Sequence, residues 1–256
     1  MIIHQPAGFA VSNRGFISRN FAKNPGGSQG AIVQKLDIRF APVERGVGQR
    51  RDGVHRRVEG VDGILAHVGA DNVRGGEIQA ETVMAAYPDG ATIMHLQGQP
   101  ASGPGIDRNR GVHNVLDTVS DKYPIVFEQT ANFNRAEGLT VTEAALAGME
   151  TPPDVIIAAN DDMALGALEA VIGLGLQDQI AIYGFDALPE ALASIRDGGL
   201  AGSIEQSPGG QSRTAMRIAV LNARGCEYDA NPLILLEPVM ITADNLDTAE
   251  RIGEVQ

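Results

Sequence analysis

The sequence predicts an α/β protein built on a parallel, doubly wound sheet. Short apolar runs rich in β-branched residues, such as 155–159, alternate with longer segments whose apolar residues recur at helical spacing. Clusters of Gly, Pro, Asn and Asp separate these segments. From residue 68 onward the alternation forms four to five βα units in series, which is typical of a parallel sheet with helices on its faces.

The individual elements follow from the same signals. A helix begins at the capping pair Asp71–Asn72 and ends before Pro88, and later helices begin where polar caps precede apolar periodicity. We expect helices at 71–86, near 107–119, at about 135–147, from 161 to about 174, at 189–196 and at 210–224. We expect strands at 91–96, 124–127, 155–159, 180–183, 202–206, 233–236 and 239–242.

The stretch 154–186 is the most informative part of the chain. It consists of a strand, a polar turn, a helix, a second strand and a second polar turn. Asn160 ends the first strand, Asp186 follows the second, and the aromatic residue Phe185 lies beside Asp186. Ligands of open α/β sheets bind at the carboxyl ends of strands, so these residues predict a binding site.

Composition restricts the class of partner. The chain of 256 residues carries a net charge of −12, which disfavours nucleic acid as a partner. It has a single cysteine, Cys226, and no apolar run of membrane-spanning length, and its first residues lack the apolar core of a secretion signal. Residues 1–60 hold ten of the 20 basic residues but only four of the 32 acidic ones. Residues 1–54 therefore differ in character from the rest, and they show no amphipathic helix.

Catalytic, metal and cofactor signatures are missing from the sequence. The loop at 98–105 is rich in Gly and Pro but lacks the Gly-Lys-Ser/Thr of a phosphate-binding loop, and no Gly-x-Ser-x-Gly motif occurs. The pair Asp161–Asp162 reads as acidic residues at a helix N-terminus. We therefore predict no enzymatic activity, no cofactor and no metal site. The histidines show no ligand spacing in sequence; they are His4, His55, His67, His95 and His113.

Several motifs in order resemble the type I periplasmic sugar-binding proteins, close to the ribose-binding branch. They are HVGADNVRGGEIQAE (67–81), LQGQPASGPGIDRNRGV (96–112), FEQTANFNRAEGLT (127–140), AANDDMALGALEA (158–170) and YGFDALPEALASIRDGGLAGSIEQSP (183–208). The resemblance covers about residues 55–256. It implies two doubly wound lobes joined by a hinge that clamp one sugar between them. The implied division is an atypical, truncated first lobe at 1–70, a sugar-binding lobe at 71–206, a return to the first lobe at 207–235 and a crossover at 236–256.

The resemblance also implies a set of ligand contacts. Their side chains suit a sugar, because carboxylate, amide and guanidinium groups can each form two hydrogen bonds with neighbouring hydroxyls, and an aromatic ring can cover the C–H face. The implied residues are Arg56, Arg110, Phe133, Asn160, Asp186 and Gln206, with Phe185 near the ligand. Taken singly, Arg110 reads as a surface residue, Phe133 as a packed aromatic and Asn160 as a helix cap.

The function implied is that of a soluble, monomeric receptor in the periplasm that captures a monosaccharide or polyol and delivers it to the membrane permease of an ABC importer. The alternative is the sugar-sensing domain of a lac-repressor-type transcription regulator, although residues 1–54 show no helix-turn-helix pattern. An α/β enzyme that uses a nucleotide lacks any phosphate-binding motif.

Two departures from the family pattern bear on activity. His55 stands where the family has an aspartate before the arginine, here Arg56. Residues 1–54 contain none of the family's first-lobe elements, and we hypothesise that they derive from an altered reading frame. The nucleotide sequence tests this hypothesis. One side of the binding cleft would then be incomplete, and we predict weak or absent sugar binding for this chain.

Overall fold

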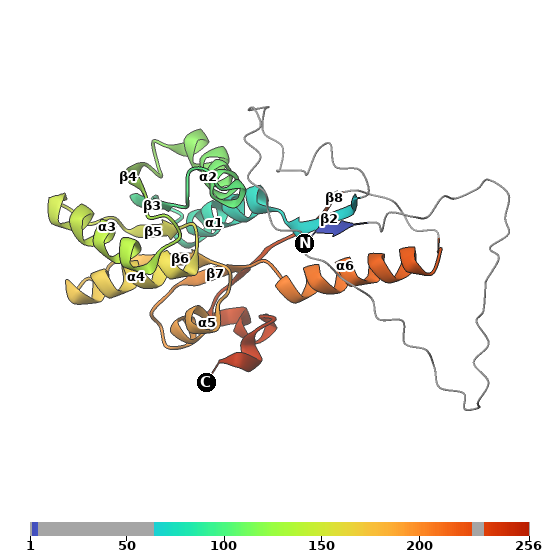
Figure 1. Cartoon of the computed structure of the whole chain (residues 1–256). Helices are drawn as coiled ribbons and strands as arrows, with labels where there is room; N and C mark the ends of the chain where they lie inside the picture. The colour runs from blue at the N-terminus through green and yellow to red at the C-terminus, as the bar shows by residue number, and fades with distance from the viewer. Residues whose placement is uncertain (1, 5–63, 227–232, 256) are drawn as a thin grey trace, which may run out of the picture.

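Two sheets organise the part of the chain that the computed structural model describes, residues 2–4, 64–226 and 233–255. The smaller sheet has the strand order β1-β2-β8, in which β2 (Ile64–Ala70) pairs parallel with β8 (Leu233–Leu236) and antiparallel with β1 (Ile2–His4). Helix α6 (Pro208–Ala223) packs against β2 and runs alongside this sheet (Figure 1).

The larger sheet has six strands in the order β4-β3-β5-β6-β7-β9, all parallel except β9 at one edge. Its central strands are buried along nearly their whole length, whereas the edge strand β4 alternates between half-buried and exposed residues. The strands are β3 (Ile93–Gln97), β4 (Ile125–Thr130), β5 (Val155–Ala158), β6 (Ala181–Phe185), β7 (Gly202–Glu205) and β9 (Val239–Ile241).

Helices cover both faces of the larger sheet, which is the doubly wound arrangement expected from the sequence (Figure 1). One face packs against α1 (Asn72–Ala86) and α2 (Gly103–Leu116), and the other against α3 (Arg135–Gly148), α4 (Asp161–Gly173) and α5 (Pro189–Arg196). Short 3₁₀ helices follow α2 and β9: η1 (Asp117–Val119), η2 (Ala243–Thr248) and η3 (Ile252–Glu254).

Side-chain caps set the start of four helices. The side chains of Asp71, Ser102, Asn134 and Asn160 each accept a hydrogen bond from the backbone N–H three residues later, at the N-termini of α1, α2, α3 and α4 respectively. In α2 the cap is followed by a proline in the first turn, which is a favourable helix-starting position.

Glycines allow both helix pairs to pack at very short range. A Cβ atom at Gly76 of α1 would lie 2.2 Å from the carbonyl oxygen of Arg108 in α2, and one at Gly166 of α4 would lie 2.1 Å from the carbonyl oxygen of Arg135 in α3. Gly111 and Gly138 make the reciprocal contacts from α2 and α3. The backbones of the paired helices therefore touch directly, which no side chain larger than hydrogen permits.

The predicted α/β class and the parallel sheet are confirmed, with changes at some boundaries. Helix α2 begins at Gly103 instead of near residue 107, and α6 begins at Pro208 instead of 210. The division into lobes at residues 70, 206 and 235 stays a prediction. The hypothesis about residues 1–54 concerns a segment that, apart from residues 2–4, is outside the described residues. Among the described residues, no helix combines the length and the apolar character needed to cross a bilayer.

Candidate functional site

The strained backbone of the described residues is concentrated at the carboxyl ends of three strands of the larger sheet. Five residues other than glycine have positive φ, and each follows β4, β6 or β7. They are Asn132 (φ 55°), Phe133 (φ 58°), Asp186 (φ 116°), Ala187 (φ 47°) and Ser207 (φ 48°). Residues held in sparsely populated conformations gather at functional sites, where the surrounding structure compensates for the strain. This edge of the sheet is therefore the candidate site.

Phe133 lies between β4 and α3 in a loop that polar side chains hold in place. The hydroxyl of Thr130 donates a hydrogen bond to the carbonyl of Gly98 (2.8 Å) and accepts one from the backbone N–H of Asn132 (3.2 Å). The side-chain amide of Asn132 donates to the carboxylate of Glu137 (2.7 Å). The Phe133 ring lies against Gly98, where a Cβ atom would come within 2.2 Å of the ring. The ring position therefore depends on a glycine at residue 98.

Arg108 of α2 is the central cation of the site. Its guanidinium donates hydrogen bonds to the side-chain oxygen of Asn72 (2.9 Å) and to the backbone carbonyl of Ala159 at the end of β5 (2.6 Å). The guanidinium carbon lies 3.6 Å from the ring centroid of Phe185 and 5.7 Å from that of Phe133. Two aromatic rings thus contact the same cation, at distances where the ring quadrupole attracts positive charge.

Asp186 and Gln206 complete a connected set of polar groups with Arg108. One carboxylate oxygen of Asp186 accepts a hydrogen bond from the side-chain amide of Gln206 (2.6 Å) and lies 3.2 Å from the Arg108 guanidinium. The backbone N–H of Asp186 donates to the carbonyl of Ile204 (2.8 Å), and the Gln211 side chain donates to the carbonyl of Gln206 (2.7 Å). The main chain of both residues is thereby held by groups outside the set.

Burial dominates the electrostatics of this ion pair. The Arg108 side chain is 6% exposed and that of Asp186 is 22% exposed. Desolvation raises the pKa of Asp186, against the opposing influence of Arg108, and desolvation also lowers the pKa of Arg108, against the opposing influence of Asp186. Burial therefore disfavours the charged form of both Arg108 and Asp186, and additional hydrogen-bonding groups from a ligand would stabilise these charges.

Asp161 holds the segment that follows Asp186 in place. It is fully buried, and its carboxylate accepts hydrogen bonds from the hydroxyl of Ser203 (2.6 Å) and from the backbone N–H of Leu188 (2.7 Å). The same hydroxyl accepts a hydrogen bond from the backbone N–H of Ala187, which follows Asp186 (3.0 Å). The sequence reading of Asp161 as a simple helix-terminal charge was therefore incomplete. Burial raises its pKa well above the ordinary carboxyl value.

The structure brings together five of the seven predicted site residues. Phe133, Phe185, Asp186 and Gln206 lie around Arg108, and Asn160 directly follows Ala159, whose carbonyl accepts from Arg108. The oxygen of the Asn160 side chain caps α4 through the N–H of Met163 (3.0 Å), so its amide nitrogen is the group left for another partner.

One predicted arginine, Arg110, is not part of this set. Arg110 lies in the middle of α2, where its guanidinium pairs with Asp107 at 2.9 Å, and not near the start, as a helix beginning near 107 had implied. Arg108, which lies at the centre of the set, was missed by the sequence reasoning. Arg56 lies outside the described residues.

These groups can recognise a neutral, polyhydroxylated ring. Hydroxyl groups both donate and accept, so a carboxylate, a guanidinium and two amides at one edge can bind neighbouring hydroxyls. The half-buried Phe133 ring can cover apolar C–H surface, whereas the Phe185 ring is fully buried and packs against Arg108. Within the described part of the chain, this arrangement is suited to binding such a ring.

Comparison with known families supports this interpretation. Residues 61–227 match the family described as periplasmic binding protein domain. The ribose import binding protein of Bacillus subtilis is 41% identical over 143 residues, which make up 55% of this chain and 44% of that protein. The ribose import binding protein of Escherichia coli is 33% identical over 147 residues, 57% of this chain and 48% of that protein. The chain thus spans about half the length of these curated relatives.

Solved structures give the same result. The Caulobacter myo-inositol binding protein, solved with myo-inositol bound, is 46% identical with a TM-score of 0.70, over 78% of this chain and 68% of that one. A Bacillus halodurans ABC transporter solute binding protein with bound myo-inositol is 29% identical with a TM-score of 0.67, over 76% of this chain and 66% of that one.

Proposed function

The chain belongs to the family of periplasmic binding protein domains, and from that premise we propose that it is the soluble, ligand-capturing receptor of an ABC importer. The observation that carries the proposal is the set formed by Arg108, Asp186 and Gln206, joined by hydrogen bonds and an ion pair beside the rings of Phe133 and Phe185. The ligand is a monosaccharide or cyclic polyol, held at the carboxyl ends of the strands.

Selectivity follows from burial of the polar groups. A ligand that leaves Asp186 or Gln206 without a hydrogen-bond partner loses about 1–3 kcal/mol of binding free energy. The reason is that these side chains lie in a partly desolvated site. The Asp186 carboxylate accepts and the Arg108 guanidinium donates, so together they fit neighbouring hydroxyls on one ring. Ribose and myo-inositol, the compounds named for the relatives, both offer such hydroxyls, and we propose a ligand of that class for this chain.

The proposed mechanism involves no chemistry on the ligand. The protein acts as a monomer in the periplasm, captures the ligand, closes around it and presents it to a membrane permease, without a nucleic-acid partner. Closure between lobes would exclude water from the hydrogen bonds. The described residues supply contacts from one side of the ligand only, and we therefore expect this chain alone to bind weakly.

A titration observed by NMR tests the binding proposal, because it detects weak ligands and locates them. We expect D-ribose or myo-inositol to cause saturable shifts in the backbone amides of residues 98, 133, 160, 186 and 206. Glycerol, an acyclic triol, serves as the control ligand and should cause no saturable shift. Binding elsewhere, or no saturable shift with either cyclic compound, would refute the proposal.

Two arginines of α2 provide a matched pair of variants. Arg108→Met removes the buried guanidinium, whereas Arg110→Met removes a partly exposed one two residues away. We expect Arg108→Met to weaken binding about tenfold or more, since a hydrogen bond to a charged group is worth about 1.5–3 kcal/mol. Arg110→Met should bind like the parent chain. Equal affinities in both variants would contradict the assigned site, and the dispersion of the NMR spectrum shows whether each variant is folded.

A further inference from the structure

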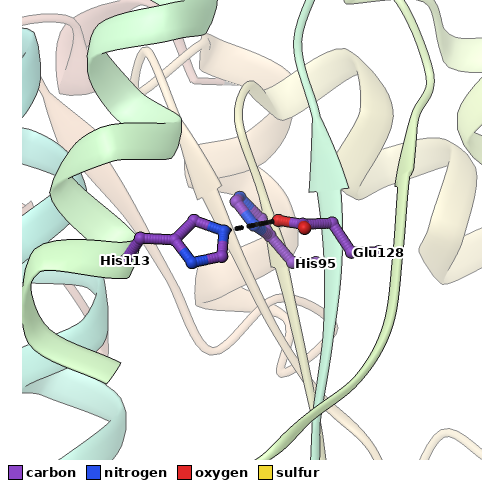
Figure 2. A group of neighbouring side chains, drawn as sticks. All are labelled: His95, His113 and Glu128. Atoms are coloured by element: carbon purple, nitrogen blue, oxygen red, sulfur yellow. Dashed lines mark hydrogen bonds and ion pairs between the residues drawn. The ribbon is translucent and has the colours of Figure 1, made fainter. Parts of the chain in front are cut away.

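A second group of chemically active side chains lies where β3, β4 and α2 meet. His95 of β3 and Glu128 of β4 are partners in the parallel register of these strands, so their side chains emerge side by side. His113, near the C-terminal end of α2, points toward both of them (Figure 2). His95 Nδ1 and His113 Nε2 each lie 2.8 Å from the same oxygen of Glu128.

The three ligand-type atoms converge on one point. One ring nitrogen of His95, one of His113 and a carboxylate oxygen of Glu128 all lie within 4.8 Å of one another. In a tetrahedral zinc site with bonds of about 2.0–2.2 Å, ligand atoms are about 3.3–3.5 Å apart. Small rotations of the side chains would therefore bring all three atoms to bonding distance from one zinc ion placed between them. Two imidazoles with one carboxylate form a donor set that zinc sites with an open position use.

A further contact orients one of the imidazoles. His113 Nδ1 lies 2.9 Å from a carboxylate oxygen of Asp117, one turn later in the chain. A hydrogen bond from Nδ1 to a carboxylate fixes the tautomer whose Nε2 lone pair is available, which is the arrangement found behind metal-binding histidines. An ion at this position would replace the proton that Nε2 donates to the Glu128 carboxylate 2.8 Å away. The group therefore has an orienting residue as well as three donors.

The three donor residues differ in burial, and a cavity next to them gives access from solvent. The His95 side chain is 1% exposed, whereas those of His113 and Glu128 are 29% and 30% exposed. A cavity of about 350 Å³ adjoins the group, lined among others by His113, Asp117, Tyr123 and Glu128. An ion would thus have one ligand anchored in the core, two at the surface, and a route from solvent.

We propose that His95, His113 and Glu128 bind a divalent transition-metal ion of the zinc type, with Asp117 orienting His113 and the fourth position facing the cavity. Such an ion would join the edge strand β4 to β3 and α2. The proposal is independent of the function proposed above, because the group uses none of the residues of the candidate sugar site.

The test is a calorimetric titration of the untagged, EDTA-treated chain with Zn²⁺ alone, since a histidine tag would bind zinc itself. We expect saturable binding of one ion per chain. Glu128→Gln and His113→Asn should each weaken affinity by tenfold or more, and Asp117→Asn by about 10- to 100-fold. Glu143→Gln, which changes an exposed glutamate on α3, should leave affinity unchanged.

His113 and Glu128 are suitable for substitution because both are partly exposed, and an NMR spectrum of each metal-free variant shows that it is folded. Substitution of Zn²⁺ by Co²⁺ adds a second readout, because tetrahedral Co²⁺ with histidine ligands absorbs visible light. Absence of saturable zinc binding by the parent chain would mean that the group is a hydrogen-bonded cluster only and would overturn the proposal. Equal zinc affinity of the parent chain, His113→Asn and Glu128→Gln would also overturn it.

Discussion

The larger and the smaller sheet differ in how their strands are covered, although both contain parallel pairs. Strands β5 and β7 of the larger sheet are buried at every residue, because helices pack on both faces. All four residues of β8 in the smaller sheet are only half-buried, and α6 contributes two buried residues, Ala215 and Ile218. Among the described residues, stability and the candidate sites are therefore both concentrated in the larger sheet and its helices.

The largest effect is expected from one pair of apolar substitutions, which compares the loss of stability in the two sheets. Ile157→Ala in β5 removes a fully buried side chain, and we expect a loss of about 3–4 kcal/mol in the free energy of unfolding. Ile234→Ala in β8 removes a half-buried one and should cost about 1 kcal/mol. Urea denaturation followed by far-UV circular dichroism measures both. Equal losses would show that the smaller sheet is as tightly packed as the larger one.

A glycine substitution tests the close helix packing within the larger unit. Gly76→Ala would place a Cβ atom 2.2 Å from a backbone oxygen of α2, so we expect a loss of about 2–3 kcal/mol, by analogy with overpacked cores. Gly148→Ala at the end of α3 meets no atom within 4 Å and should be neutral or slightly stabilising. Thermal denaturation compares the two variants. A fully stable Gly76→Ala protein would mean that α1 and α2 can separate without cost.

The buried carboxylate of Asp161 gives an intermediate effect. Asp161→Ala leaves the Ser203 hydroxyl and the Leu188 N–H without their shared acceptor, and we expect a loss of about 2–3 kcal/mol. Asp162→Ala, the adjacent change, affects a side chain that is 43% exposed and should cost less than about 1 kcal/mol. Urea denaturation distinguishes them. Similar losses in the two variants would contradict the support role given to Asp161.

The smallest effect is a dependence on pH. The pKa of Asp186 is raised in the folded protein, so the folded state binds a proton more readily than the unfolded chain. Stability of the parent chain relative to Asp186→Asn should therefore increase as pH falls from the raised pKa toward 3.8. The hydrogen bond with Arg196 lowers the pKa of Asp197. The stability of the parent chain relative to Asp197→Asn should therefore decrease as pH falls, which is the opposite sign. Denaturation curves between pH 7 and 4 measure the effect of Asp186, and curves below pH 4 measure that of Asp197. Equal signs would contradict the assigned burial of Asp186.

Much of the fold followed from local pattern. The strand at 155–158, the helix at Pro189–Arg196 and the strand Leu233–Leu236 lie at or within one residue of the places that apolar runs and punctuating residues predicted. The position of the site at the carboxyl ends of strands also followed from the alternation of strands and helices.

Errors in the site came from helix phase and from contacts distant in sequence. With α2 started near 107 instead of at Gly103, Arg110 seemed to lie at a helix start. The cap Ser102 and the proline after it were a usable signal, and from that start Gly105, Arg108 and Val112 share the buried side of α2. His95, His113 and Glu128 come from three elements, so no spacing in sequence could reveal their proximity.

The glycine contact between α1 and α2 has a consequence for the energetics of recognition. Because the carbonyl of Arg108 lies against Gly76, main-chain contact sets where the arginine backbone lies, and Asn72 and Ala159 hold its side chain. The Arg108 side chain of the proposed ligand site is thus ordered before any ligand binds. Association then loses little conformational entropy at this residue, and the free energy otherwise spent on ordering it remains available as affinity.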